Sequence, residues 1–309
     1  MQPATGISPL VIVGSINVDL SFYTHSFPEP GETINGLSFS KAFGGKGANQ
    51  AAMSGLLNAN GATMIGKVAS DSHGSECLSN LKNFNVNVTG SVLTADGEST
   101  GTACIQVDSM GENKIIVIPG ANALLTPEDI SSCESFIEAG SGLICQLEVP
   151  PNTVLSAMKV AAAADKKVYF NPSPCLPLDT IKELLENTTV CVVNQGELNV
   201  VSQKVTGNVD ECVVAGRKLI NTYGIRSVIT TLGSEGSVYI TKDDFVKCPP
   251  AAIEGEIVDC VGAGDCFLAT VVYELEIGSE PLDAMVRANK MAGRSICGKG
   301  AMTSYNIGL

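Results

Sequence analysis

Short apolar runs alternate with amphipathic stretches along the second half of the chain. The runs predict strands at 143–146, 167–171, 190–194 and 227–233, and the stretches between them predict helices at 152–164, 179–186 and from 195 to about 221. Two earlier runs, 10–16 and 62–69, predict strands with a helix at 47–58 between them. Strands that alternate with helices favour a mostly parallel sheet with helices on both faces, which is a three-layer α/β/α sandwich.

Two segments depart from this alternation. Residues 32–43 and 100–118 are rich in β-branched side chains, and the second contains the turn-like sequence SMGEN. Both are typical of antiparallel strands with no helix between them. They predict a small β-sheet lid, formed by about 17–43 and 100–118, on a single α/β domain that spans residues 1–309. A sheet beside the strand ends of an α/β body is well placed to cover a ligand.

Composition narrows the classes of function. The 309 residues include 19 basic and 32 acidic side chains, for a net charge of −13, so recognition of nucleic acid by bulk charge is not expected. Eleven cysteines without a C-x-x-C pair favour small buried side chains over a disulfide framework or a zinc site. The N-terminal stretch lacks a basic region, and no apolar run is long enough to span a bilayer. A cytoplasmic protein without membrane contact is therefore expected.

Two glycine patterns resemble nucleotide-binding motifs but do not complete them. Residues 61–68 match most of a phosphate-binding P-loop, but Val68 stands where the magnesium-binding hydroxyl belongs and the apolar run lies inside the motif. A buried strand ending in Gly66 explains these residues better. The first strand is followed by Gly14 alone, where a dinucleotide fingerprint needs three glycines. Both observations argue against these two nucleotide-binding classes.

Other polar segments are expected to converge at strand ends. In 42–52, AFGGKGANQAA, Gly44 and Gly45 precede a helix N-terminus that, with Lys46, could bind a polar ligand. The less favoured alternative is a tight turn between the lid and the helix. Further polar or glycine segments occupy 14–19, 146–148, 194–197, 231–236 and 259–265. An open α/β sheet builds its site from such segments, where its strands end.

The segment 259–265, DCVGAGD, places an acid directly behind three small residues at the start of a predicted helix. One interpretation is an ordinary N-cap, in which Asp265 serves only the helix. The other is a carboxylate beside backbone amides that can hold an anion, since a helix N-terminus presents unpaired N–H groups. The remaining motifs favour the second interpretation.

The chain resembles the PfkB family of carbohydrate kinases, and within it the ribokinases, over nearly its whole length. The shared elements are GSINVD, FPEPGET, AFGGKGANQA, GESTG, QLE, N-x-x-E, TLGSEG, D-x-x-x-A-G-D and KGA, in family order. This resemblance implies a ribokinase-like fold that transfers the γ-phosphoryl group of ATP to the 5-hydroxyl of ribose. It also implies a homodimer whose lids pack together.

The resemblance assigns roles to particular residues. Asp265 would be the base, and the amides of Gly262, Ala263 and Gly264 would form an anion hole. The sugar would be bound by Asn17, Asp19, Gly45, Lys46, Asn49 and Glu148, together with Asp265. Thr231, Gly233, Gly236, Gly264 and Asn289 would line the nucleotide, while Asn194 and Glu197 would organise Mg²⁺ and the phosphates.

A monovalent cation site is implied as well. Potassium would be held, mainly by backbone carbonyls, near Asp259, Val261, Ser295, Gly298, Gly300 and Ser304. Gly298 departs from the family pattern, in which a larger and often basic residue stands at this position.

Three alternatives remain open. Adenosine kinases share the fold and the base, but they need an apolar or aromatic shelf for a second purine, whereas acids and amides dominate here. Another kinase of the family could act on deoxyribose or fructose, since lid residues can exchange one hydroxyl partner for another. A non-enzymatic sugar-binding protein is the third alternative, but it would be expected to lose the base, the anion hole or the N-x-x-E element.

Overall fold

The computed structural model describes residues 6–305, and its body is a large, mostly parallel sheet. In spatial order the strands are β14 (Phe245–Cys248), β13 (Ser237–Ile240), β12 (Ser227–Thr231), β11 (Val190–Asn194), β10 (Lys167–Phe170), β9 (Gly142–Cys145), β1 (Leu10–Val13), β4 (Ala62–Ala69) and β5 (Val86–Asn87), with β6 (Val92–Ala95) also paired to β4. β13 runs antiparallel to both of its neighbours, β12 and β14. Of residues 61–68, all but Gly61 belong to the strand β4, as predicted, although this strand continues past Gly66 to Ala69.

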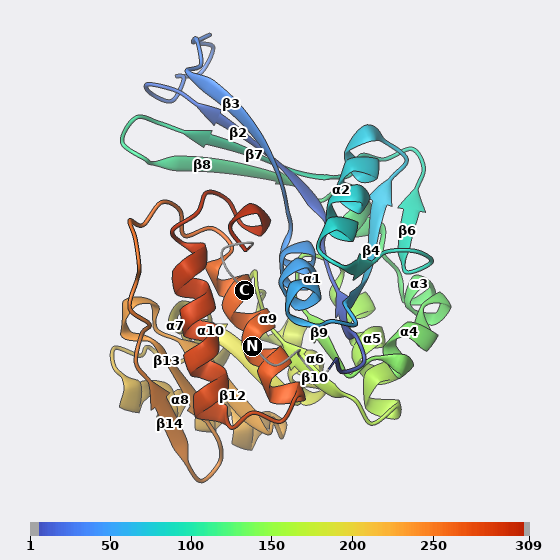
Figure 1. The fold of residues 1–309 in the computed structure, drawn as a ribbon, viewed down its shortest axis with the longest axis vertical. Coiled ribbons are helices and arrows are strands. Elements are labelled where there is room, and N and C mark those ends of the chain that lie inside the picture. The colour runs from blue at the N-terminus through green and yellow to red at the C-terminus, as the bar shows by residue number, and fades with distance from the viewer. Residues whose placement is uncertain (1–5, 306–309) are drawn as a thin grey trace.

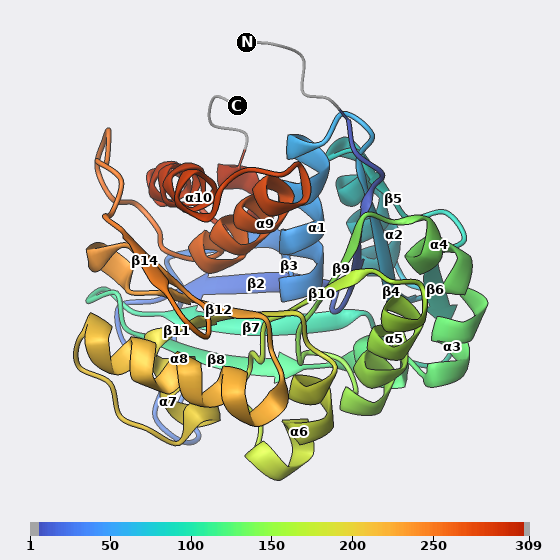
Figure 2. The same cartoon turned by 90° about the horizontal axis from the view of Figure 1, so that it is seen from below.

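Helices cover both faces of this sheet, which confirms the predicted layers (Figure 2). One face carries α1 (Lys46–Leu57), α2 (Ser72–Asn83), α9 (Ala263–Glu276) and α10 (Pro281–Ser295). The other carries α3 (Pro127–Ser132), α4 (Glu134–Ala139), α5 (Pro151–Ala163), α6 (Leu178–Glu186), α7 (Gln195–Ser202) and α8 (Val209–Tyr223). Three short 3₁₀ helices, η1 (Gly120–Leu124), η2 (Gly233–Glu235) and η3 (Met302–Ser304), lie in connections.

The strands alternate between two hydrophobic cores. In β1, Leu10 and Ile12 pack toward α1 and α9, whereas Val11 and Val13 pack toward α5. Because both faces are covered, the strands are apolar at successive positions, which is the pattern that predicted them. All eleven cysteine thiols are free, and seven are buried. Among residues 6–305, no helix has both the length and the apolar character needed to cross a membrane.

The lid sheet consists of β2 (Asn17–Tyr23), β3 (Ser38–Gly44), β7 (Gly101–Val107) and β8 (Asn113–Ile118), in the order β3-β2-β7-β8. It projects from the body above α9 and α10 (Figure 1). The antiparallel pair predicted for 100–118 is confirmed. Two boundaries were wrong: the first strand ends at Val13 instead of residue 16, and the strand predicted for 32–43 begins only at Ser38.

Close packing between α1 and the end of α2 depends on Gly55. A Cβ atom at this position would lie 2.2 Å from the carbonyl oxygen of Phe84, which belongs to the backbone and has little freedom to move. We therefore expect Gly55→Ala to lower the free energy of unfolding by about 1–3 kcal/mol, despite the better helix propensity of alanine. Urea denaturation measures the change.

A glycine in the interior of another helix provides the matched control. A Cβ atom on Gly293 of α10 would meet its nearest neighbour, Ala251 Cβ, at an ordinary 3.7 Å. Gly293→Ala should therefore raise the free energy of unfolding by about 0.5–1 kcal/mol. Equal effects of the two substitutions would contradict the packing argument.

Candidate active site

Two adjoining cavities lie where parallel strands such as β11 and β12 end. The inner cavity is bounded by Lys46, Asn171, Asn194, Glu197 and Asp265, with Val192, Val193, Gly262 and Leu268. The outer cavity, of about 390 Å³, is bounded by Gly233, Gly236, Ile253, Ile257 and Asn289, among others. Thr231, Gly264 and Phe267 line both cavities, so the start of α9 forms their common wall.

Asp265 lies in the first turn of α9 and is 8% exposed. Its carboxylate caps no amide of its own helix: Oδ2 accepts from Asn49 Nδ2 at 2.9 Å, and Oδ1 from Gln50 Nε2 at 2.8 Å. The N-cap interpretation was therefore wrong: Gly262 is the N-cap residue of α9, and the helix has no side-chain cap. Burial raises the pKa of Asp265 despite the opposing effects of Lys46 and the two amides, which makes the carboxylate a stronger proton acceptor.

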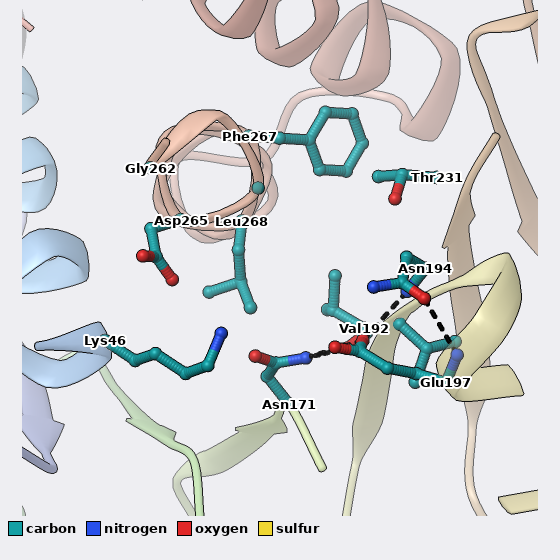
Figure 3. Close-up of a pocket in the computed structure, with 12 residues that line it drawn as sticks. Lys46, Asn171, Val192, Asn194, Glu197, Thr231, Gly262, Asp265, Phe267 and Leu268 are labelled. Carbon is teal, nitrogen blue, oxygen red and sulfur yellow. Dashed lines mark hydrogen bonds between the residues drawn. The ribbon is translucent and has the colours of Figure 1, made fainter. Parts of the chain in front are cut away.

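The turn before Asp265 borders both cavities: Gly262 lines the inner one, Ala263 the outer one, and Gly264 both. Gly262 has φ of 78°, and a Cβ atom there would lie 2.4 Å from Ala301 Cβ. The hydroxyl of Tyr305 donates to the Gly262 carbonyl at 2.8 Å, which fixes the turn from the far end of the chain. A Cβ atom on Gly264 would meet nothing within 4 Å, so this residue borders open space where an anion can approach the backbone. Figure 3 shows Gly262 and Asp265 at this end of α9.

Two further acids lie near the first turn of α1. Glu148 Oε2 accepts from the Lys46 backbone N–H at 2.9 Å and from the Ser15 hydroxyl. Asp19 lies against Gly44, where a Cβ atom would be 2.2 Å from Asp19 Oδ2. Burial, and next the charge of Glu148, raise the pKa of Asp19 to about 6. The structure thus groups acceptors suited to a ligand that offers hydroxyl donors.

Asn17 and Asp19 come shortly after the first strand, as expected, and lie within β2. Asn17 is oriented by Asn122 of η1, a residue that the sequence motifs missed. The Asn122 amide donates to Asn17 Oδ1 at 2.8 Å and to the Ile16 carbonyl, and its own oxygen accepts from the Ile16 N–H. Gly101 leaves room for this contact, since a Cβ atom there would lie 2.3 Å from Asn17 Oδ1.

The N-x-x-E element forms a capping box at the start of α7. Asn194 Oδ1 accepts from the Glu197 N–H at 2.8 Å, and Glu197 Oε2 accepts from the Asn194 N–H at 3.0 Å and from Asn171 Nδ2 at 3.2 Å. Figure 3 shows these bonds, with the Lys46 side chain extending toward them from the opposite wall. Lys46 was expected to bind the sugar, and it also lines the inner cavity together with Asn194 and Glu197. Asn171 is a second residue that the motifs missed.

The residues expected to line a nucleotide come together around the outer cavity. Thr231, Gly233, Gly236 and Asn289 approach it from β12, η2 and α10. Gly236 has φ of 92°, and a Cβ atom there would lie 2.2 Å from the Cys248 carbonyl oxygen. The cavity wall also contains apolar side chains such as Ile253 and Ile257, which can pack against a flat ring.

The residues expected around a monovalent cation also meet in part. Asp259 accepts from the Val261 N–H at 3.0 Å and the Gly300 N–H at 2.9 Å, and so ties together two loops. Gly298 N–H donates to the Ser295 carbonyl, and Ser295 and Ser304 are buried. One expectation was wrong: the segment 259–265 does not directly follow a strand, because residues 249–258 separate it from β14.

Residues 8–307 match the model of the pfkB family carbohydrate kinases, and the chain belongs to this family. It is 33% identical to a ribokinase of Dictyostelium discoideum over 309 residues, with 96% of each chain covered. It is 32% identical to a deoxyribokinase of Salmonella typhi, with 96% of this chain and 95% of the relative covered. The structure of an Arabidopsis thaliana ribokinase complexed with ribose and ATP matches with a TM-score of 0.89 at 27% identity, covering 96% of this chain and 95% of that one. The protein is a sugar kinase with a ribokinase-like fold.

We expect the ionised Asp19 carboxylate to lower the free energy of unfolding of the sugar-free protein. Its pKa is near 6 in the folded chain and 3.8 ordinarily, so the folded state binds the proton more tightly, and stability should rise as pH falls from about 6 toward 4. We expect Asp19→Asn to raise the free energy of unfolding at neutral pH by about 1–3 kcal/mol and to remove this pH dependence. Sugar binding should weaken. Urea denaturation and calorimetry measure the two effects.

Asp71 provides a control of opposite sign. Burial acts to raise its pKa, but hydrogen bonds from Thr100 and the Gly74 N–H outweigh burial and lower it. Asp71→Asn should therefore destabilise the protein at neutral pH. Changes of the same sign for both substitutions would refute the electrostatic argument.

Proposed function

We propose that this protein transfers the γ-phosphoryl group of ATP to the 5-hydroxyl of D-ribose. The observation that most supports this proposal is the position of Asp265. Its buried carboxylate follows a glycine turn that has free space at Gly264, and it lies beside the wall shared by the two cavities. Glu148 lies close enough to affect the charge of Asp265, and the outer cavity shares Gly264 and Phe267 with the inner cavity that Asp265 lines. This arrangement suits a sugar hydroxyl and a nucleotide phosphate that meet at Asp265.

The chemistry follows from these groups. Asp265 accepts the proton of the attacking hydroxyl as the oxygen–phosphorus bond forms. The N–H groups at the start of α9 neutralise charge on the transferred phosphoryl oxygens, aided by the helix dipole. Lys46, which lines the inner cavity, adds a positive charge on the opposite side. The base, the turn and the N-x-x-E element are all present, and this favours an enzyme over a sugar-binding protein.

Ribose is the proposed sugar because polar acceptors surround the predicted sugar site. A ribokinase and a deoxyribokinase are almost equally similar to this chain, so deoxyribose is the first competing substrate. The structural relative that contains ribose and ATP supports the choice of both ligands. The free cysteine thiols agree with a cytoplasmic location, which is part of the proposal.

Magnesium and potassium complete the proposal. Glu197 presents a carboxylate at the inner cavity, which suits Mg²⁺ held partly through waters, and the ion would supply charge neutralisation at the phosphates. Potassium would be held near Asp259 and the carbonyls of Val261, Ser295, Gly298, Gly300 and Ser304. Because Asp259 bonds to the Val261 N–H, charge at this position would stabilise the turn that leads to Gly262.

ATP consumption with ribose, deoxyribose, fructose and adenosine tests the proposal. Ribose should give the highest kcat/KM, and turnover should be higher in potassium than in a bulky organic cation at matched ionic strength. Asp265→Asn should lower kcat by roughly 10²–10⁴ while ribose binding, measured by calorimetry, persists. A variant that keeps most of the wild-type turnover would rule out Asp265 as the base, and a preference for another substrate would replace ribose.

The proposal includes a homodimer formed through the lid sheet. All six residues of β8 are exposed, and four of them are large and apolar. On one face of the sheet Phe22 and Phe39 form a cross-strand pair with ring centroids 5.3 Å apart, and Phe39 and Ile116 are 58% and 63% exposed. An isolated sheet with this much exposed apolar surface gains stability by packing against a second copy.

Light scattering at micromolar concentration should therefore give twice the 32.0 kDa mass of one chain. Ile116→Glu should shift the mass to that of a monomer, because it places a charge on this apolar surface. Val205→Glu is the matched control: Val205 is 91% exposed but lies outside the lid sheet, so its substitution should leave the mass unchanged. A monomeric wild-type protein would contradict the dimer.

A further inference from the structure

Two consecutive side chains of α1 hold both oxygens of the Asp265 carboxylate. Asn49 Nδ2 bonds to Oδ2, and Gln50 Nε2 bonds to Oδ1 at 2.8 Å. Gln50 is fully buried, so it has no access to substrate or solvent. Its side chain instead connects α1 to the reacting group at the start of α9.

Gln50 is itself held by Gln146, which follows β9 and is also fully buried. Gln146 Nε2 donates to Gln50 Oε1 at 2.5 Å. Gln146 Oε1 lies against the backbone of Gly14, where a Cβ atom would be 2.1 Å away. A side chain at position 14 would thus displace Gln146, and a glycine is required after β1.

The direction of these hydrogen bonds is set by the carboxylate. An ionised carboxylate can only accept, so Gln50 must turn its NH₂ group toward Asp265 and its carbonyl oxygen away. That carbonyl then needs a donor, and the Gln146 amide supplies it. The chain from Gln146 through Gln50 is therefore complementary to ionised Asp265, and a proton on Oδ1 would face the Gln50 NH₂ group without an acceptor.

We infer that Gln50, supported by Gln146, is a positioning residue that holds the Asp265 carboxylate in the orientation needed for proton acceptance. This inference rests on the proposed function, in which Asp265 is the base. A carboxylate in a first helical turn can rotate about its side-chain bonds, and a rotated oxygen would lie away from the hydroxyl that it serves. Precise placement of reacting groups contributes strongly to catalysis.

Substitution of Gln50 tests this role. Gln50→Met keeps an unbranched chain of similar length but removes the donor, and Gln50→Leu is a second apolar variant. For both we expect kcat to fall roughly 10- to 100-fold, which corresponds to the free energy of one hydrogen bond to a charged group. The KM values for sugar and ATP should change less than about threefold, because Gln50 contacts neither ligand.

A pH profile separates positioning from packing. The groups that face Asp265 are Lys46, Glu148, Cys266 and the Tyr305 hydroxyl, and none of them is altered in the variants. Loss of a hydrogen bond to the charged form raises a carboxyl pKa. The acidic limb of kcat/KM should therefore move up by about one pH unit in Gln50→Met. An NMR titration of the Asp265 carboxyl carbon should show the same shift without any need for turnover.

Ser54→Ala is the matched control. Ser54 lies one turn further along α1, is fully buried, and its hydroxyl has no hydrogen-bond partner among the described residues. This variant should keep both the wild-type kcat and the wild-type pH profile. Gln146→Leu, which leaves the Gln50–Asp265 bond but removes its support, should show a smaller loss of kcat than Gln50→Met.

A double-mutant cycle completes the test. If Gln50 acts through the charge on Asp265, then adding Gln50→Met to Asp265→Asn should lower kcat no further. A folded Gln50→Met protein with wild-type kcat and pH profile, or losses that multiply in the double variant, would overturn the inference and leave the proposed function intact. A wild-type protein that phosphorylates no sugar would instead overturn the proposed function, and the catalytic role of Gln50 with it.

Discussion

The close contact between the first turn of α1 and the backbone after β1 determines the geometry of the site. A Cβ atom on Gly47 would lie 2.6 Å from the Ser15 nitrogen, and the Ala48 N–H donates to the Ser15 carbonyl at 2.9 Å. Only glycine permits this approach, and it brings three side-chain positions of α1 to the end of the sheet. The Lys46 backbone N–H then bonds to Glu148, and the side chains of Asn49 and Gln50 bond to Asp265; both acids lie more than a hundred residues away in sequence.

This contact concentrates negative charge in a poorly hydrated region. Asp19, Glu148 and Asp265 lie near one another, and burial raises the pKa of both aspartates. Such an arrangement is unfavourable for folding, and it persists because amides and the Lys46 ammonium compensate part of the cost. Burial also makes these carboxylates good hydrogen-bond acceptors for hydroxyl groups. The free energy of folding lost by burying them is therefore recovered when a polar ligand binds.

The sequence predicted the body of the fold well because parallel strands covered on both faces appear in the sequence as short, continuous apolar runs. The strands at β4 and β11 were predicted with their observed ends, and the helix at α1 within one residue. The pattern did not identify β2, in which only Asn17 and Val18 are buried and whose pairing with β7 joins segments about 80 residues apart. It also predicted neither β13, which runs antiparallel to β12 and β14, nor β14 at the edge of the sheet.

The sequence by itself determined the chemical groups of the site: the acid behind three small residues, the glycine-rich turn before α1, and the N-x-x-E element. These signals are local, since each motif combines a turn with a helix start, and local backbone geometry restricts which residues fit. Only the tertiary structure decided how the groups are connected. It showed that Asp265 is bonded across to α1 instead of capping its own helix, and it revealed Asn122, Asn171 and the Gln146–Gln50 pair as buried partners. A lone buried amide has no periodicity and no fixed spacing to its partner, so its role becomes visible only when the chain is folded.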